Sequence, residues 1–379
     1  MRNKKAFAVA AAAFSGALLA AGCSSGSGGG GGNSGTDWSK ATSVAQGGGM
    51  KALIAAAKKE GGLNVITLPA NWANYGTIMK DFTAKYGIKI NDANPDGSGQ
   101  DEINAMVQLK GQSRAPDVLD MGTAFAIKAD QQHLLAKYQV AAWSDIPAAE
   151  KSTDGTWYGG YGGYVAIGYD SKKITVPPTS LKDLAKPIYK HEIGIKGNPT
   201  QASAAFSAVY AAALANGGSL GNIEPGVQFF AKLKKEANYV PVTAGPTTVQ
   251  SGQTPIVVWW DYLLASEVSA TDPSFKIVIP SDAAYAAYYD QAINADAPHP
   301  AAARLWEEYL YSVTGQNLWL QGKARPVELP TMIANGTVDK AANAALPPPP
   351  SAPLQFPTQA QESAAEGIVA KQWAAKVGG

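Results

Sequence analysis

Apolar and polar residues alternate along the first part of the chain in two different patterns. Residues 50–61 have a helical composition and stop at a glycine pair, and residues 75–87 place Ile78, Met79 and Phe82 on one helical face before a glycine. A third helix is predicted at about residues 99–111. Short apolar runs indicate strands at 63–69, 88–92 and 116–122. Alternating strands and helices with short connections predict a parallel α/β sheet, in which ligands bind at the carboxyl ends of the strands.

The pattern changes in the segment "TWYGGYGGYVAIGYD", residues 156–170. Glycine and tyrosine alternate there before an apolar strand at 165–169, which suits a backbone that crosses closely between two lobes. A second run of strands and helices follows, and the chain is expected to return to the first lobe near Asp290. Two lobes joined by two crossover strands form a hinge around a cleft. The predicted strands lie at 192–197, 254–260 and 275–280, and the predicted helices at 201–218 and 226–238.

Composition agrees with two folded lobes and excludes some partners. The chain has 379 residues, of which 46% are hydrophobic and 16% charged, and its formal net charge is +1. Two domains are the expected division of a chain of this length. Nothing in the charge balance indicates binding to nucleic acid. The single cysteine excludes disulfides within the folded chain and a cysteine-based metal site.

The N-terminus predicts export. Basic residues precede an apolar run at 6–21 that is too short for a comfortable membrane span. The segment ends in "LLAAGC", which resembles a bacterial lipobox and implies that Cys23 carries lipid on the outer face of the cell membrane. One departure is Ala20, at the place where leucine is usual, and a plain secretory signal with a chance cysteine is the alternative. The Gly/Ser-rich stretch that follows is typical of a flexible tether.

These features divide the chain into five predicted segments. They are a signal peptide at 1–23, a tether at 24–40, the first part of lobe 1 at 41–165, lobe 2 at 166–289, and a return to lobe 1 with C-terminal helices at 290–379.

Several segments, taken in order, carry a resemblance to a known family. They are "NWANYG", "APDVLDMGTAFAIKADQQHLLAKY", "GYVAIGYD", "PTSLKDLAKPIYKHEIGI" and "INADAPHPAAARLWEEYLYSVTGQ". With these segments the chain resembles, over nearly all of its mature length, type 2 periplasmic solute-binding proteins of ABC importers, in the branch of ferric iron, thiamine, polyamine and 2-aminoethylphosphonate binders. The resemblance implies a two-lobed type II α/β fold, a small-molecule solute, and permease and ATPase subunits as partners. It implies a monomer that is not an enzyme and uses no cofactor or metal.

Aromatic residues at strand ends suggest the kind of solute. Trp72 and Tyr75 follow the first strand and are similar to the aromatic wall of polyamine binders, since aromatic faces attract ammonium groups. Trp72 could instead simply cover the sheet edge. Trp259, Trp260 and Asp261 end a buried strand in the second lobe. Asp261 could pair with an amine or act as a helix N-cap.

Iron ranks low as the solute. Ferric binders of this branch are expected to have adjacent tyrosines where this chain has tryptophans, and indole does not ligate iron. Of the later pair Tyr288 and Tyr289, one is expected to face the cleft, and Tyr289 is the candidate.

Predicted helix starts supply polar groups for the other end of the solute. Ser98, Thr123, Thr200 and Gln201 offer side-chain polar groups and backbone N–H groups suited to an anion. Ordinary helix capping explains each of them individually. The segment "GNPTQASAAF" has no carboxylate, so one amine with an anionic or polar far end fits better than several amines. Tyr164 in the crossover segment completes the predicted ligand-binding set.

The loop "NDANPDGSGQDE", residues 91–102, matches the start of a calcium-binding EF-hand loop. The position that requires a bidentate glutamate is Ile103, so we expect Ser98 and Asp101 to form a helix capping box instead. The pattern G-x-S-x-G at residues 217–221 follows an Ala-rich helix rather than a strand, which disfavours a hydrolase. The sequence therefore predicts the binding component of an ABC importer for an amine-bearing solute. A ferric iron or thiamine receptor, or a lipid-anchored enzyme, are the alternatives.

Overall fold

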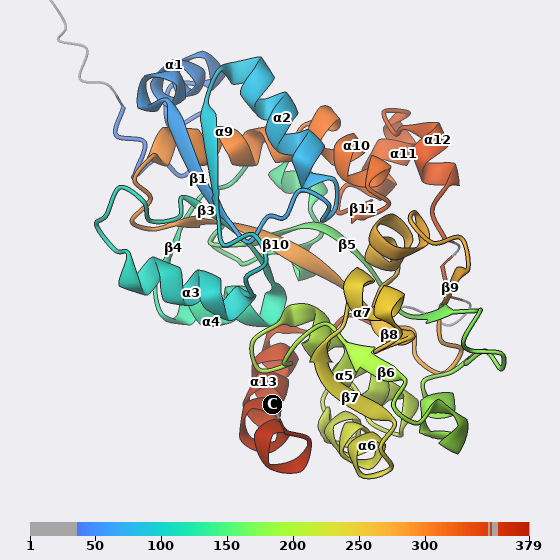
Figure 1. Ribbon diagram of the computed structural model, residues 1–379. Helices are drawn as coiled ribbons and strands as arrows, with labels where there is room; N and C mark the ends of the chain where they lie inside the picture. Colours follow the sequence, from blue (N-terminus) through green and yellow to red (C-terminus); the bar gives the residue numbers. More distant parts are fainter. Residues whose placement is uncertain (1–35, 348, 351–354, 379) are drawn as a thin grey trace, which may run out of the picture. The chain divides into compact units, whose positions relative to one another are not determined.

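The computed structural model describes residues 36–347, 349–350 and 355–378 (Figure 1). The predicted signal peptide, Cys23 and most of the predicted tether lie outside these ranges. Within them, no helix combines the length and the apolar character needed to span a bilayer.

The described chain contains the following elements. The strands are β1 (Gly62–Ile66), β2 (Lys89–Ala93), β3 (Val118–Gly122), β4 (Leu135–Ala136), β5 (Tyr158–Asp170), β6 (Ile193–Ile195), β7 (Tyr239–Thr243), β8 (Ile256–Trp260), β9 (Phe275–Val278), β10 (Ala286–Asn294) and β11 (Arg325–Pro326). The helices are α1 (Met50–Glu60), α2 (Tyr75–Tyr86), α3 (Gly99–Gln108), α4 (Thr123–Gln131), α5 (Ser203–Ala215), α6 (Glu224–Lys235), α7 (Pro246–Ser251), α8 (Asp261–Leu263), α9 (Pro300–Leu310), α10 (Val313–Gln321), α11 (Leu329–Asn335), α12 (Lys340–Ala344) and α13 (Gln359–Lys376). Short 3-10 helices are η1 (Trp143–Asp145), η2 (Ala148–Glu150), η3 (Lys182–Ala185) and η4 (Pro187–Tyr189), and η5 (Leu264–Ser269) is π-helical.

The strands form a small and a large sheet. β1 and β2 pair in parallel, and the large sheet has the order β3-β10-β5-β8-β6-β7. β6 is parallel to both of its neighbours, whereas β3, β10, β5 and β8 pair antiparallel. We refer to the part built on β1, β2 and β3 as the first lobe and to the part built on β6, β7 and β8 as the second lobe. The predicted α/β fold is confirmed, with antiparallel pairing where the crossover strands enter each lobe.

β5 is the strand that the two lobes share. Its first half pairs with β10, from Tyr158 to Tyr164, and its second half pairs with β8, from Val165 to Tyr169. β10 pairs in turn with β3. The crossover strand predicted at 165–169 is therefore longer, because the glycine-rich stretch before it is also extended.

The glycines of β5 permit close approach of other backbone. A Cβ atom on Gly162 would lie 2.2 Å from the carbonyl oxygen of Ala287, and one on Gly163 would lie 2.5 Å from Oδ1 of Asp261. No side chain fits at these distances. The alternation of glycine and tyrosine thus reflects a backbone crossing, as the sequence indicates. The segment boundaries predicted near residues 165 and 289 fall inside β5 and β10 and stay predictions.

The first two helices end as their sequence indicates. Gly61 and Gly87 follow α1 and α2 with φ of 73°, the left-handed conformation that glycine adopts without steric cost. α3 stops at Gln108, three residues before the predicted end.

The last helix, α13, lies against elements of both lobes (Figure 1). It packs on α4 of the first lobe, where Lys128 Nζ lies 3.2 Å from Glu366 Oε1. It also packs on α6 of the second lobe, where Trp373 is buried against Phe230 with ring centroids 5.5 Å apart. The C-terminal segment is thus a connection between the lobes.

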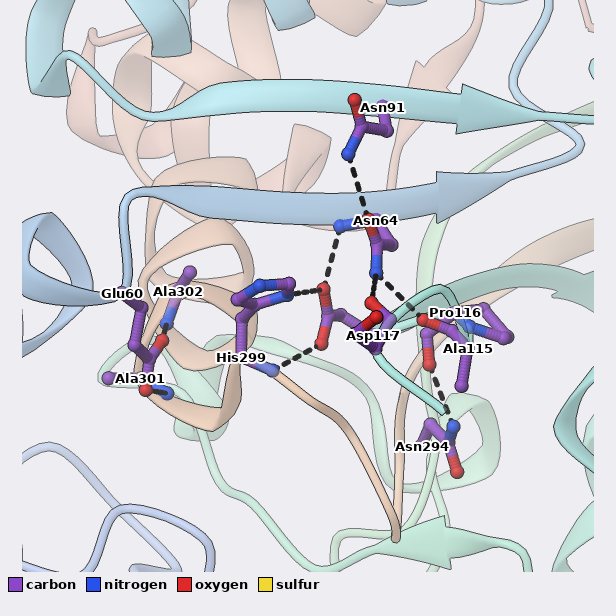
Figure 2. A network of polar contacts seen from close by, with 11 residues as sticks. Glu60, Asn64, Asn91, Ala115, Pro116, Asp117, Asn294, His299, Ala301 and Ala302 are labelled. Atoms are coloured by element: carbon purple, nitrogen blue, oxygen red, sulfur yellow. Dashed lines mark hydrogen bonds and ion pairs between the residues drawn. The ribbon is translucent and has the colours of Figure 1, made fainter. Parts of the chain in front are cut away.

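A polar network fixes strands of the first lobe (Figure 2). Asp117, fully buried just before β3, accepts from the backbone N–H of Asn64 at 2.6 Å and from that of His299 at 2.7 Å. The His299 ring nitrogen Nδ1 lies 2.8 Å from Asp117 Oδ2, and this bond raises the pKa of His299. Glu60 accepts from the first backbone N–H groups of α9. The network therefore fixes the positions of β1, β3 and the start of α9 relative to one another.

Candidate functional site

A cavity of about 450 Å³ opens between the two lobes. It lies beyond the carboxyl ends of β1 and β3 and next to the starts of α3 and α5. We call it the cleft. It is lined by Thr67, Pro69, Asn71, Trp72, Pro95, Asp96, Gly97, Ser98, Gly99, Asp101, Glu102, Asp120, Met121 and Tyr289, and by second-lobe residues Lys196, Gly197, Asn198, Gln201, Ala202, Ser203, Ala204, Thr243 and Glu267.

Trp72 and Tyr289 form an aromatic wall of the cleft. Their rings meet edge to face with centroids 5.4 Å apart, and Tyr289 stacks on Tyr161 of β5 at 5.7 Å. The Trp72 indole Nε1 donates to the Tyr161 hydroxyl at 2.7 Å. The ring centroid of Trp259, in the second lobe, lies 6.1 Å from that of Trp72. The wall therefore rests on both crossover strands, β5 and β10.

Asp120, on β3, is a buried carboxyl residue that lines the cleft. Its Oδ2 accepts from the Tyr161 hydroxyl at 2.6 Å, and its Oδ1 accepts from Gln291 Nε2 at 2.5 Å. Burial raises the pKa of Asp120 to about 7, against the hydrogen bonds that lower it. One hydroxyl, on Tyr161, thus joins Trp72 to Asp120.

Glu102 is a second buried carboxyl beside the cleft. It accepts from Thr67 Oγ1 at 2.5 Å and from the backbone N–H of Asp120 at 3.2 Å. Burial raises its pKa well above the usual value. Asp120 and Glu102, the two buried carboxyl residues that line the cleft from the first lobe, therefore already have donors.

The second lobe contributes one cation and one carboxyl to the cleft. Lys196 Nζ lies 4.7 Å from the centroid of the Trp259 ring. Glu267 lies on the π-helical segment η5 and is 9% exposed. Burial raises the pKa of Glu267 to about 7, although the charge of Lys196 lowers it.

Four of the residues predicted from the sequence line the cleft: Trp72, Ser98, Gln201 and Tyr289. The second member of the tyrosine pair, Tyr288, stacks on Phe356 instead. Trp259 does not line the cleft but is buried beside it, next to the Trp72 and Lys196 side chains. The role of each of these residues in binding stays a prediction.

The other predicted residues do not line the cleft. Tyr75 is fully buried between Trp306 and Tyr161, and Thr200 bonds to Asn198. Thr123 and Trp260 line a separate small cavity of about 10 Å³. Tyr164 lies under a guanidinium group, with Arg325 Cζ 3.9 Å from its ring centroid.

Asp261 is paired within the protein. It is fully buried, its Oδ2 accepts from Arg325 Nη1 at 2.7 Å, and its Oδ1 accepts from the backbone N–H of Tyr164 at 2.9 Å. Asp261 is the first residue of α8, whose N-cap is Trp260. Its carboxylate thus ties β8 to β5 and β11, rather than facing the cleft or capping a helix.

The acidic loop before α3 forms the rim of the cleft. Ser98 Oγ accepts from the Asp101 backbone N–H at 3.3 Å, and Asp101 Oδ2 accepts from the Ser98 backbone N–H at 2.9 Å. The predicted capping box is confirmed. Among the residues that the structure describes, no group of three or more His, Cys, Asp or Glu is placed to hold a metal ion.

Sequence reasoning missed three charged residues of the cleft, Asp120, Lys196 and Glu267. Asp120 stands in an otherwise apolar strand, "VLDMG", which is a signal that could have identified it. Lys196 follows directly after β6, at a strand end. Glu267 had no such signal, because nothing in "LASEVS" predicts the π-helical turn that carries it.

Comparison with protein families decides which class of protein has this cleft. The model of a family described as bacterial extracellular solute-binding protein matches residues 113–360, which is more than half of the chain. The chain is a bacterial extracellular solute-binding protein. No curated protein matches this solute-binding protein.

Solved structures share the fold of this solute-binding protein. They include the periplasmic binding protein AfuA from Actinobacillus pleuropneumoniae with fructose-6-phosphate bound (17% identity, TM-score 0.67, covering 83% of this chain and 98% of that one). Iron-bound HitA from Pseudomonas aeruginosa is similar at 21% identity and a TM-score of 0.60, covering 81% and 99%. A periplasmic thiamin binding protein is similar at 19% identity and a TM-score of 0.62, covering 83% and 96%. The two-lobed type II fold of periplasmic binding proteins is thereby confirmed.

The family defines the general role of this solute-binding protein. It is the substrate-binding component of an ABC importer, which binds a small molecule outside the cytoplasm and meets a membrane permease. Proteins of this family are binding proteins rather than enzymes.

Proposed function

We propose that the cleft captures a small organic amine for delivery to the permease. The observation that carries this proposal is the excess of carboxyl groups over basic groups in the lining of the cleft. Five carboxyl residues line the cleft, and Lys196 is the only basic residue among the lining residues of the described chain. The carboxyl residues are Asp96, Asp101, Glu102, Asp120 and Glu267.

The aromatic wall supports the same class of solute. An ammonium group over the face of a tryptophan or tyrosine gains about 0.5–2 kcal/mol, depending on how far it is desolvated. Trp72 and Tyr289 offer such faces beside Asp120. Closure is favoured only by a solute that interacts more strongly with the closed than with the open state. Because residues of both lobes line the cleft, a solute that contacts both of them meets this requirement.

Thermal unfolding with a panel of solutes tests the proposal. The panel contains 1,4-diaminobutane, spermidine, 2-aminoethylphosphonate, thiamine, fructose-6-phosphate and a ferric salt. An amine at a thousandfold excess over its dissociation constant should add about 4 kcal/mol to the free energy of unfolding. Stabilisation by the sugar phosphate or the ferric salt alone would contradict the proposal.

Trp72→Ala identifies the site within the same experiment. We expect this variant to lower the affinity for the stabilising amine by about 2- to 30-fold, because the cation–π contact is lost. Trp143→Ala is the matched control, since Trp143 is a half-buried tryptophan that does not line the cleft. An equal loss of affinity in both variants would show that the aromatic wall does not bind the amine.

We also propose that Cys23 anchors the mature protein to the membrane by a lipid. The support is the sequence "LLAAGC" after the predicted signal segment, all of it outside the described residues. Mass spectrometry of the protein from its own cells should find the mature chain beginning at an acylated Cys23. A mature chain that begins elsewhere, with no lipid, would favour a plain secretory signal.

A further inference from the structure

Glu267 differs from the other buried carboxyl residues of the cleft. Asp120 accepts hydrogen bonds from the crossover strands β5 and β10, and Glu102 accepts two from within the first lobe. Glu267 is 9% exposed and lines the cleft from the second lobe. Within the described chain its carboxyl group has charged neighbours, Lys196 and Asp96, but no hydrogen-bond donor. It is the buried cleft carboxyl with free acceptor capacity.

Lys196 does not fill that capacity. Its ammonium group lies over the Trp259 ring at 4.7 Å from the centroid, and no ion pair within 4.0 Å joins it to Glu267 in the described structure. Lys196 therefore acts on Glu267 through space, as the lowering of the Glu267 pKa by its charge indicates. Burial removes part of the hydration of the Glu267 carboxyl group, which borders the cleft. A cationic donor that enters the cleft would replace the lost hydration.

The local backbone gives Glu267 its position. The six residues of η5 are π-helical, with one more residue per hydrogen-bonded turn than an α-helix. π-helical turns are rare and frequently found at functional sites. The segment follows α8, which the Asp261–Arg325 ion pair holds in place. Glu267 is thus carried on a fixed element rather than on a free loop.

We propose that Glu267 is the second-lobe anchor for a cationic group, so that the solute carries two amino groups, one bound by each lobe. The proposal rests on the proposed function and specifies the solute class further. The first amino group lies at the aromatic wall and Asp120, and the second donates to Glu267. A diamine therefore contacts both lobes, and its binding favours closure. The segment "GNPTQASAAF" has no carboxyl group for a second amine. In this proposal Glu267, from a different part of the chain, supplies it.

Three probes built on the same four-carbon chain test the proposal by calorimetry. They are 1,4-diaminobutane, 1-aminobutane and 4-aminobutyrate, which place an amine, a methyl group or a carboxylate at the far end. We expect the wild-type protein to bind 1,4-diaminobutane at least tenfold more tightly than either of the others. Tighter binding of 4-aminobutyrate would show that Lys196 and the helix starts receive the far end, and would overturn the proposal.

Glu267→Gln removes the anchor. We expect this variant to lose the preference for 1,4-diaminobutane while its affinity for 1-aminobutane changes less than twofold. Glu328→Gln is the matched control, because Glu328 is a buried carboxyl residue with a raised pKa that lies outside the cleft. Glu328→Gln should keep the wild-type preference. Glu267→Asp, which retains the charge on a shorter side chain, serves as the second variant and should weaken the preference without abolishing it.

The outcomes separate this proposal from the proposed function. Failure of all three probes to bind the wild-type protein would overturn both. Equal binding of the diamine and the monoamine, or a preference that survives Glu267→Gln, would overturn only the role of Glu267.

Discussion

Replacing Arg325 by methionine is expected to lower the free energy of unfolding by about 3–5 kcal/mol at neutral pH. Arg325 is the partner of the fully buried Asp261, and its other guanidinium nitrogen, Nη2, donates to the carbonyl oxygen of Pro347 at 2.8 Å. Removing the cation leaves a fully buried carboxylate without its charged partner. The loss should be larger than that of any single contact at the cleft rim.

The loss from Arg325→Met should depend on pH. Burial raises the pKa of Asp261 in the folded state even with Arg325 present. A carboxyl group with a raised folded pKa stabilises the fold most below its unfolded pKa of about 3.9, and this contribution is lost as the pH rises. Without Arg325 the pKa of Asp261 in the folded protein rises further. The variant should therefore lose less free energy of unfolding at pH 5 than at pH 8.

Chemical denaturation at both pH values checks the prediction. Arg114→Met is the control, because Arg114 is exposed and the same substitution removes no buried pair. If Arg325→Met lowers the free energy of unfolding by less than about 1 kcal/mol, or by the same amount at both pH values, Asp261 does not form a charged pair with Arg325.

Tyr161→Phe is expected to weaken both the fold and the cleft. The substitution removes the hydroxyl that accepts from Trp72 and donates to Asp120. A buried carboxyl oxygen then loses its donor, which costs about 1–3 kcal/mol of stability. The Trp72 ring also loses the bond that orients it, so the affinity for an amine should fall by about as much as in Trp72→Ala.

Tyr262→Phe is the matched control for this effect. Tyr262 is also fully buried, its ring lies 6.0 Å from that of Tyr161, and its hydroxyl has no hydrogen-bond partner among the described residues. Denaturation and calorimetry should find Tyr262→Phe close to wild type in both stability and affinity. If both variants behave alike, the hydroxyl of Tyr161 has no special role and only ring packing matters.

The elements that could be predicted are those specified by local sequence. α1 and α2 show helical composition and end at glycine, and the glycine-rich part of β5 indicated a crossover before any contact was known. Strand pairing was harder, because antiparallel contacts of β5 with β10 and β8 join residues more than 80 positions apart. Nothing local in β5 specifies which strands lie beside it.

The cleft residues that could be predicted lie mostly near the ends of elements. Trp72 comes soon after β1, and Ser98 and Gln201 shortly precede helices, whereas Tyr289 lies within β10. Asp261 also follows a strand, β8, but its orientation depends on Arg325, which lies 64 positions later in the chain. Glu267 was missed because its direction depends on a π-helical turn. The charge of the cleft is thus a property of tertiary contacts rather than of motifs.

The position of α13 bears on how the solute-binding protein opens. Rotation of the lobes must loosen either its apolar contact with α6 or its ion pair with α4. The buried ring of Trp373 is costlier to expose than the partly hydrated pair of Lys128 and Glu366, whose side chains are 34% and 19% exposed. The helix is therefore expected to travel with the second lobe and to part from α4. Since dissolved salt screens an ion pair of this kind, the ionic strength outside the cell bears on how readily the empty receptor opens.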